Sequence, residues 1–103
     1  MLFTTSITFA QKATDNFAGN WKTSEGIIIE ITKSGAAFIG KPTGKSIEVL
    51  KNLTFKNGKW VGVLNNPQKN TTVNCEAYLE GNKIKFLAKK GMMSKEVIWT
   101  KAN

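Results

Sequence analysis

The sequence contains no histidine and no arginine, and it has a single cysteine, Cys75. Without histidine the chain cannot form a Ser-His-Asp or Cys-His catalytic group, and it lacks the most common zinc ligand. A lone cysteine excludes an internal disulfide. The seven acidic residues stand singly along the chain, and no spacing pairs two of them as general acid and base. We therefore expect no enzymatic activity, no cofactor and no metal site.

Long hydrophobic runs are also absent, so no segment reaches the roughly twenty apolar residues that a membrane-spanning helix needs. The segment Met1–Ala10 is moderately apolar, carries no charge, and has the small residues Thr8 and Ala10 where a signal peptidase would cleave. We predict that residues 1–10 are a signal-peptide remnant or a disordered tail and that residues 11–103 form one domain. The alternative for the tail is a first β-strand. A signal peptide implies a periplasmic or secreted protein.

Positive charge is in excess, with fifteen lysines against seven acidic residues and a net charge of +8. This excess indicates either an anionic partner or AT-rich codons, since ten asparagines accompany the lysines. We favour the codon explanation and expect no specific nucleic-acid binding. The candidate basic surface consists of Lys83, Lys85 and Lys89 on the outward face of one expected strand, with Lys90 next to that strand. It would either dock on anionic lipid or polysaccharide, or simply be a solvated face that prevents edge-to-edge aggregation.

The hydrophobic pattern from Asn16 onward is that of β-strands. Short runs of β-branched and aromatic residues alternate with turn signals, of which Asn57-Gly58 is the strongest. After an opening strand near Phe17, the expected strands are 26–33, 36–41, 46–50, 52–56, 59–65, 71–80, 83–89 and 95–101. Most are joined as hairpins. The sequence therefore predicts an all-β, up-and-down antiparallel β-barrel of about eight strands.

Two motifs at the ends of this pattern resemble those of lipocalin-like barrels. Phe17–Trp21 contains a Gly-x-Trp, and the last expected strand ends in Ile98–Lys101, which is Ile-Trp-Thr-Lys. In lipocalin-like barrels the glycine lets the chain curve inward, the tryptophan plugs the closed end, and a late basic residue stacks on the indole. The resemblance thus implies a closed-end plug formed by Gly19, Trp21 and Lys101.

The middle of the chain carries a more specific resemblance. Val49–Leu53, Gly58–Gly62, Asn66-Pro67 and Cys75 follow one another in the order and spacing seen in a bacterial secreted family called domain of unknown function 2147. Asn66-Pro67 stands where that family has Asp-Pro, so this chain resembles a divergent member. The resemblance covers about Phe17 to Lys101 and implies a small lipocalin-like barrel and an exported protein, but no established activity.

Alternation along the expected strands places an apolar set inside the barrel. The candidate ligand-binding residues of this interior are Trp60, Phe38, Phe55, Leu64 and Phe86. They include no charged group, so we expect no chemistry there. An eight-stranded barrel has room for side chains or for one small ligand. The first hypothesis is therefore a secreted, non-enzymatic, monomeric barrel that binds a small apolar ligand or an anionic envelope component. The alternative is a filled barrel without a small-molecule ligand, which acts as a protein-interaction or inhibitor module.

Overall fold

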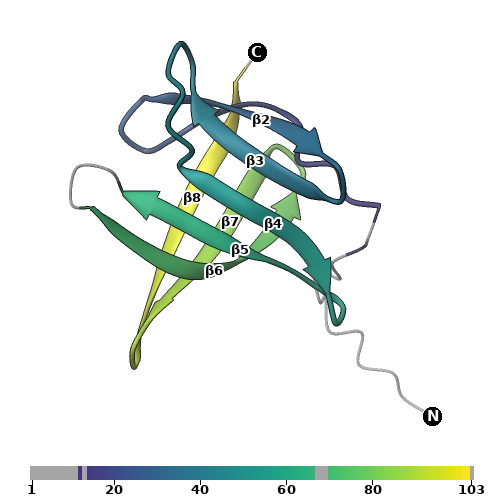
Figure 1. Ribbon diagram of the computed structural model, residues 1–103, viewed down its shortest axis with the longest axis vertical. Helices are drawn as coiled ribbons and strands as arrows, with labels where there is room; N and C mark the ends of the chain where they lie inside the picture. Colours follow the sequence, from purple (N-terminus) through teal and green to yellow (C-terminus); the bar gives the residue numbers. More distant parts are fainter. Residues whose placement is uncertain (1–11, 13, 67–69, 103) are drawn as a thin grey trace.

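The computed structural model describes residues 12, 14–66 and 70–102, which form a closed antiparallel β-barrel (Figure 1). The strands are β1 (Gly19–Lys22), β2 (Ile28–Ser34), β3 (Ala37–Pro42), β4 (Leu50–Lys56), β5 (Lys59–Asn66), β6 (Thr71–Glu80), β7 (Lys83–Lys90) and β8 (Met93–Ala102). Each strand pairs with the next, and β8 pairs with β1 to close the barrel. The predicted all-β, up-and-down barrel is therefore confirmed.

Two-residue turns set the register of most hairpins. At the β4–β5 turn, Asn57 and Gly58 both have positive φ, of 53° and 80°, as a type I′ turn requires. This turn matches the right-handed twist of the strands it joins, and it makes Lys56 and Lys59 direct partners. The hairpin expected from Asn57-Gly58 is therefore present.

The segment between β3 and β4 differs from the prediction. A strand was expected over 46–50, yet β4 begins only at Leu50 and continues through the expected 52–56 strand. Asn52, with a φ of 52°, lies where the β4–β5 register shifts, so a bulge joins the two apolar runs into one bent strand. The backbone of Val49 bridges β3 and β5, since its N–H donates to Gly40 and its carbonyl accepts from Asn65. Alternation alone does not reveal such a bulge.

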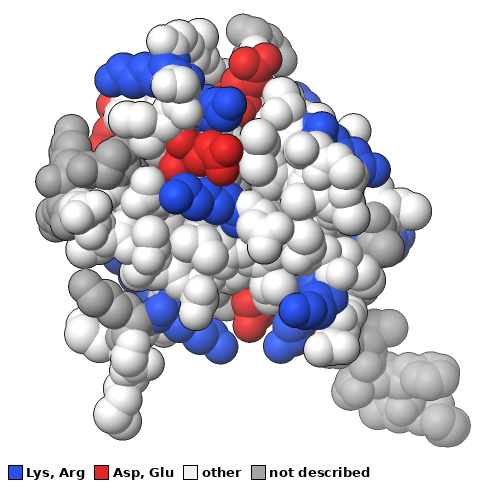
Figure 2. Space-filling model, viewed as in Figure 1, with Lys and Arg blue, Asp and Glu red and all other residues white. Residues whose placement is uncertain are grey.

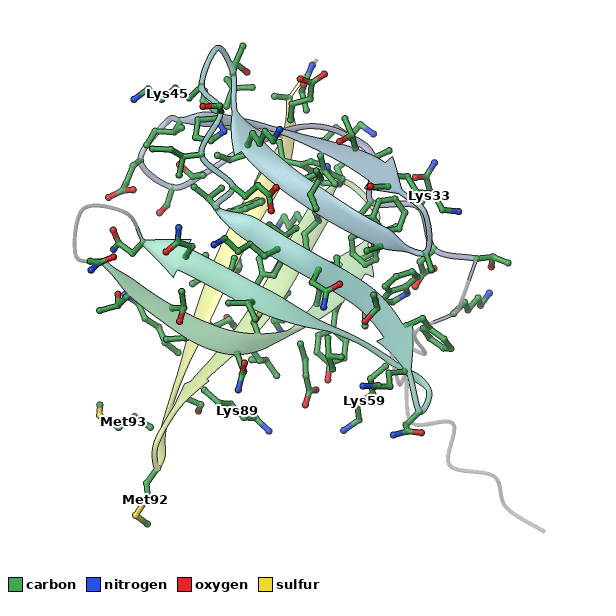
Figure 3. The ribbon with its side chains drawn as sticks, in the orientation of Figure 1. Lys33, Lys45, Lys59, Lys89, Met92 and Met93 are labelled. Carbon is green, nitrogen blue, oxygen red and sulfur yellow. The ribbon has the colours of Figure 1, made fainter. Side chains whose placement is uncertain are left out.

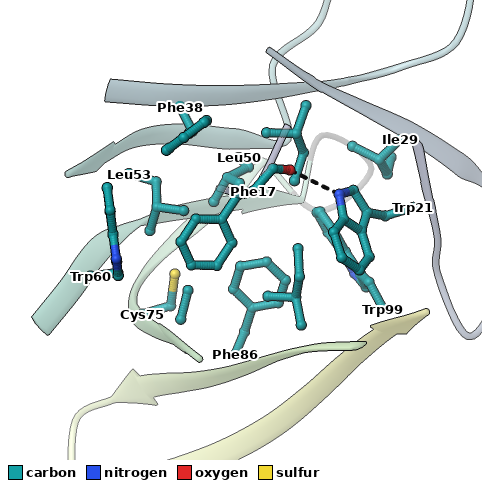
Figure 4. Packing of buried hydrophobic residues seen from close by; sticks show 13 residues of the cluster. Phe17, Trp21, Ile29, Phe38, Leu50, Leu53, Trp60, Cys75, Phe86 and Trp99 are labelled. Carbon is teal, nitrogen blue, oxygen red and sulfur yellow. Dashed lines mark hydrogen bonds between the residues drawn. The ribbon is translucent and has the colours of Figure 1, made fainter. Parts of the chain in front are cut away.

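The core fills the inside of the barrel with apolar side chains (Figure 4). Its buried members are Phe17, Trp21, Ile29, Ile31, Phe38, Leu50, Leu53, Trp60, Cys75, Ala77, Ile84, Phe86 and Trp99. No buried polar or charged residue occurs among the described residues. Cys75 is a free, buried cysteine. The structure also places Phe17, Leu50 and Leu53 in the core, although none of them belonged to the set expected inside.

Residues 1–10, the predicted signal remnant or tail, lie outside the described part of the chain. Within the part that is described, no helix has the length and apolar character needed to cross a membrane.

Candidate functional site

Three of the expected interior aromatics come together at one side of the core. Phe38 belongs to β3, Phe55 to β4 and Trp60 to β5, and Phe55 is directly opposite Trp60 in the register. The ring centroid of Trp60 lies 5.5 Å from Phe38 and 5.4 Å from Phe55, both in edge-to-face geometry. Such pairs stabilise by about 0.5–1.5 kcal/mol beyond the area they bury. This cluster is the part of the interior where an apolar ligand was expected.

The space beside these rings is taken by Phe17. This side chain is completely buried (0% exposed), and its ring centroid lies 5.2 Å from Trp60 and 5.6 Å from Phe38. Figure 4 shows the ring in the middle of the packed residues, between Trp60 on one side and Trp21 on the other. The interior that the sequence left open for a ligand therefore holds a side chain of the protein itself.

Phe17 reaches the interior from the segment before β1, which we call the strap (residues 14–18). Two indole N–H groups hold the chain at this end: Trp21 Nε1 donates to the carbonyl of Phe17 at 2.9 Å, and Trp60 Nε1 donates to the carbonyl of Lys12 at 2.8 Å. Asn16 accepts a hydrogen bond from the backbone N–H of Ala18 through its side-chain oxygen. Phe17 follows the polar residues Thr14–Asn16 and is not part of an alternating apolar pattern. Only the structure therefore identifies it as a core residue.

The other two interior candidates lie apart from this aromatic cluster. Phe86 of β7 is fully buried and packs edge-to-face on Trp99 at 4.6 Å between ring centroids. Leu64 of β5 is partly buried, packs against the core, and pairs with Leu50 and Val73 across its two neighbouring strands. The five expected ligand-binding residues thus all belong to the core or pack against it, and the Phe17 ring lies against two of them, Phe38 and Trp60.

The structure brings Gly19, Trp21 and Lys101 together where β1 meets β8. Trp21 is 1% exposed and is the direct register partner of Lys101, whose ammonium nitrogen lies 5.1 Å from the indole centroid. Gly19 has a φ of 135°, a conformation that residues with a Cβ rarely adopt. A Cβ there would also lie 3.4 Å from the Lys101 Nζ atom. These are the contacts that the lipocalin-like resemblance implied.

Two surface depressions lie on the described part of the protein. One, of about 400 Å³, lies beside the strap and is lined by Thr14, Asp15, Asn16, Lys33, Phe38 and Trp60. Its lining thus combines polar side chains of the strap with Phe38 and Trp60, two of the interior aromatics. The other, of about 340 Å³, lies across β4–β7 and includes Val61, Val63, Glu76, Leu87 and Lys89 in its lining.

The outer face of β5, β6 and β7 carries a charge cluster centred on Glu76. Its carboxylate lies 3.7 Å from the Lys59 ammonium and 3.6 Å from that of Lys89, and it accepts a hydrogen bond of 2.8 Å from the Tyr78 hydroxyl. The hydrogen bond from this hydroxyl is the largest of the causes that lower the pKa of Glu76 below its ordinary value. The positive charges of the two lysines lower that pKa further. Figure 2 shows acidic and basic side chains close together on the surface, including a red patch between blue ones near the lower edge of the view.

The expected basic surface lies along β7 and its partner strands. Lys85 forms an ion pair with Glu96 of β8 at 3.3 Å, and Lys89 contacts Glu76 of β6. Lys83 pairs with Thr100 in the register, and Lys90 with Met93 at the end of the β7–β8 hairpin. Lys83, Lys85 and Lys89 therefore lie at separate positions along β7 and are not gathered into one pocket.

Reactive or metal-binding groups are scarce in the described part of the chain. Burial raises the pKa of the Cys75 thiol to about 12, so the thiol is neutral and shielded at physiological pH. No group of three or more Cys, Asp or Glu side chains is placed to hold a metal ion among the described residues.

The fold and the packing of its interior define the protein as a small all-β barrel with an aromatic-rich core. Comparisons with protein-family models, with curated proteins and with solved structures find no match to this chain.

Proposed function

We propose that the protein is a non-enzymatic, filled-barrel interaction module that binds its partner through its outer surface. One observation carries this proposal: Phe17, fully buried, occupies the interior beside Phe38 and Trp60. A small apolar ligand would have to displace this ring and leave its packing partners without contacts. The uncharged end segment, Met1–Ala10, supports a periplasmic or secreted location as part of the same proposal.

The test uses Phe17→Ala, which removes the ring and leaves an apolar space. Engineered apolar cavities of about 150 Å³ stay dry and bind benzene. We therefore expect saturating benzene to raise the melting temperature of Phe17→Ala and to leave that of the wild type unchanged, because only a ligand that binds the native state stabilises it. Phe55→Ala is the matched control, since this half-buried ring packs on Trp60 from the side, and its loss should create no enclosed site.

A second measurement addresses the small-ligand alternative directly. A fluorescent fatty acid titrated against the wild type should give no saturable change in tryptophan emission and no shift in melting temperature. Saturable binding by the wild type that is abolished in Trp60→Ala would overturn the proposal. It would favour the first hypothesis, a barrel that binds a small apolar ligand. If Phe17→Ala does not fold, Phe17→Leu leaves a smaller space, and the fatty-acid titration of the wild type still decides the question.

A further inference from the structure

The β7–β8 hairpin ends in two exposed methionines. Met92 lies in the two-residue turn after Gly91, whose φ is 62°, and Met93 begins β8. The Met92 side chain is fully exposed and that of Met93 is 78% exposed, which makes them the most exposed large apolar side chains in the described chain. Figure 3 shows both pointing away from the barrel at the far end of the hairpin. Nothing in the described chain covers them.

The tip extends beyond the strands that flank it. The β6–β7 register ends at the pair Asn74–Lys89, and β1 pairs with β8 only at Thr100–Ala102. The last pair of the hairpin, Lys90–Met93, therefore has no neighbouring strand on either side. In Figure 1 the hairpin accordingly projects from the barrel as a two-stranded ribbon. A projecting apolar tip can reach a partner surface without any rearrangement of the core.

Lysines occupy strand positions next to this tip. The three pairs nearest the turn are Ala88–Lys95, Lys89–Ser94 and Lys90–Met93, so they contain three lysines and no acidic residue. Lys95 forms no salt bridge with another described residue, and Lys89 is held only by its contact with Glu76 at 3.6 Å. The tip thus combines two exposed methionines at its end with lysines in the adjacent strand pairs.

We propose that this hairpin tip (residues 89–95) docks on an anionic phospholipid bilayer, with Met92 and Met93 in the interfacial region and the lysines against the lipid phosphates. The proposal deepens the proposed function, on which it rests, by naming the partner of the outer surface. A bilayer fits both halves of the tip, because juxtamembrane lysines are attracted to anionic lipid while unbranched apolar side chains enter the interface. A nucleic acid would use the lysines alone and leave both methionines in water.

The experiment measures partitioning of the full-length protein onto vesicles by sedimentation. We expect binding to vesicles that contain phosphatidylglycerol and phosphatidylcholine, and little binding to phosphatidylcholine alone. Met92→Ser and Met93→Ser should each weaken binding severalfold, because the apolar side chains supply affinity in proportion to buried area. Lys95→Glu changes the charge by two, and at about 1 kcal/mol per charge the partition coefficient should fall by roughly twentyfold or more.

Matched controls come from the loop between β3 and β4. Ile47 is 47% exposed, and Lys45 lies at the end of the molecule opposite Met92 in Figure 3. Ile47→Ser and Lys45→Glu should leave binding within about twofold of the wild type. All five altered residues are exposed, and circular dichroism checks that each variant folds.

Each outcome has a defined meaning. Binding that is lost in high salt and is unaffected by Met92→Ser and Met93→Ser would overturn the proposal, because it would show attraction of a basic protein to any polyanion. Equal effects of Lys45→Glu and Lys95→Glu would overturn it as well. Failure to bind vesicles would remove the membrane as partner while leaving the filled interior intact, since that is tested separately by benzene and fatty acid.

Discussion

Replacement of Trp21 and Lys101 tests the contact that joins the two ends of the sheet. Trp21 is almost fully buried, and removal of a buried tryptophan side chain costs about 3–5 kcal/mol. Trp21→Ala also leaves the Phe17 carbonyl without its 2.9 Å hydrogen bond, which is worth about 1 kcal/mol when made and more when a buried partner is left unpaired. A domain of this size has a total stability of about 5–15 kcal/mol, so the variant should be barely folded at room temperature.

Lys101→Ala should cost much less. The lysine is exposed, and a cation over an indole at an exposed site contributes about 0.5–1 kcal/mol. Trp21→Phe keeps most of the buried area but removes the indole N–H, so it should fall between the two, at about 1–3 kcal/mol. These three values rank the contributions of burial, hydrogen bonding and charge at one position.

Urea unfolding followed by circular dichroism measures all three, because the far-ultraviolet signal does not depend on the tryptophan being removed. The double variant Trp21→Phe/Lys101→Ala completes a cycle whose coupling energy reports how much more strongly the ammonium interacts with the indole than with a phenyl ring. If Lys101→Ala destabilises the protein as much as Trp21→Ala, the reasoning is refuted, because charge rather than burial would then stabilise the pairing of β1 with β8. A cost below about 1 kcal/mol for Trp21→Ala would refute the burial itself.

Three further predictions concern β5 and β6. Gly62→Ala should destabilise the fold by about 1–3 kcal/mol in urea unfolding, because its Cβ would lie 3.0 Å from the Leu53 backbone; a neutral effect would show that β4 can move aside. Glu76 has a lowered pKa in the folded state, so its contribution is present above its ordinary pKa and is lost as the pH falls through the lowered value. Tyr78→Phe should therefore destabilise at pH 7 by about 1 kcal/mol, and the difference from wild type should shrink below pH 4.5 in acid titrations; a difference that persists at pH 2 would contradict this origin. Cys75 should not react with a thiol reagent at pH 8 in the folded protein and should react fully in urea, whereas fast native labelling would show that the thiol is accessible.

Most strands could be predicted because their ends are marked locally. Asn57-Gly58 and Gly81-Asn82 are two-residue turns both in the sequence and in the structure, and alternation of apolar residues between such turns is enough to give the inward face. The bulge at Asn52 could not be predicted in this way, because it depends on how β4 fits between β3 and β5 rather than on the residues around it.

The packing of the interior could not be predicted from the sequence, for a different reason. Alternation identifies Phe38 and Trp60 as inward, but it does not say how much space their rings leave. That space is filled by Phe17, a residue outside any strand, through contacts to positions more than twenty residues away in the chain. The sequence thus predicted residues that line the candidate site, but it did not predict that Phe17 packs against them.

The short β1–β8 seam has a consequence for how the barrel forms and opens. Only three register pairs, Asn20–Ala102, Trp21–Lys101 and Lys22–Thr100, close the cylinder, whereas β5, β6 and β7 share seven pairs at each of their boundaries. These three pairs join opposite ends of the polypeptide, so they carry the largest loop-closure entropy in the molecule. The hairpins can therefore assemble first, and the seam closes last. Amide hydrogens of the β1–β8 pairs should exchange with solvent well before those of β6. The native barrel would then open transiently between β1 and β8 into a curved sheet, while its central strands stay paired.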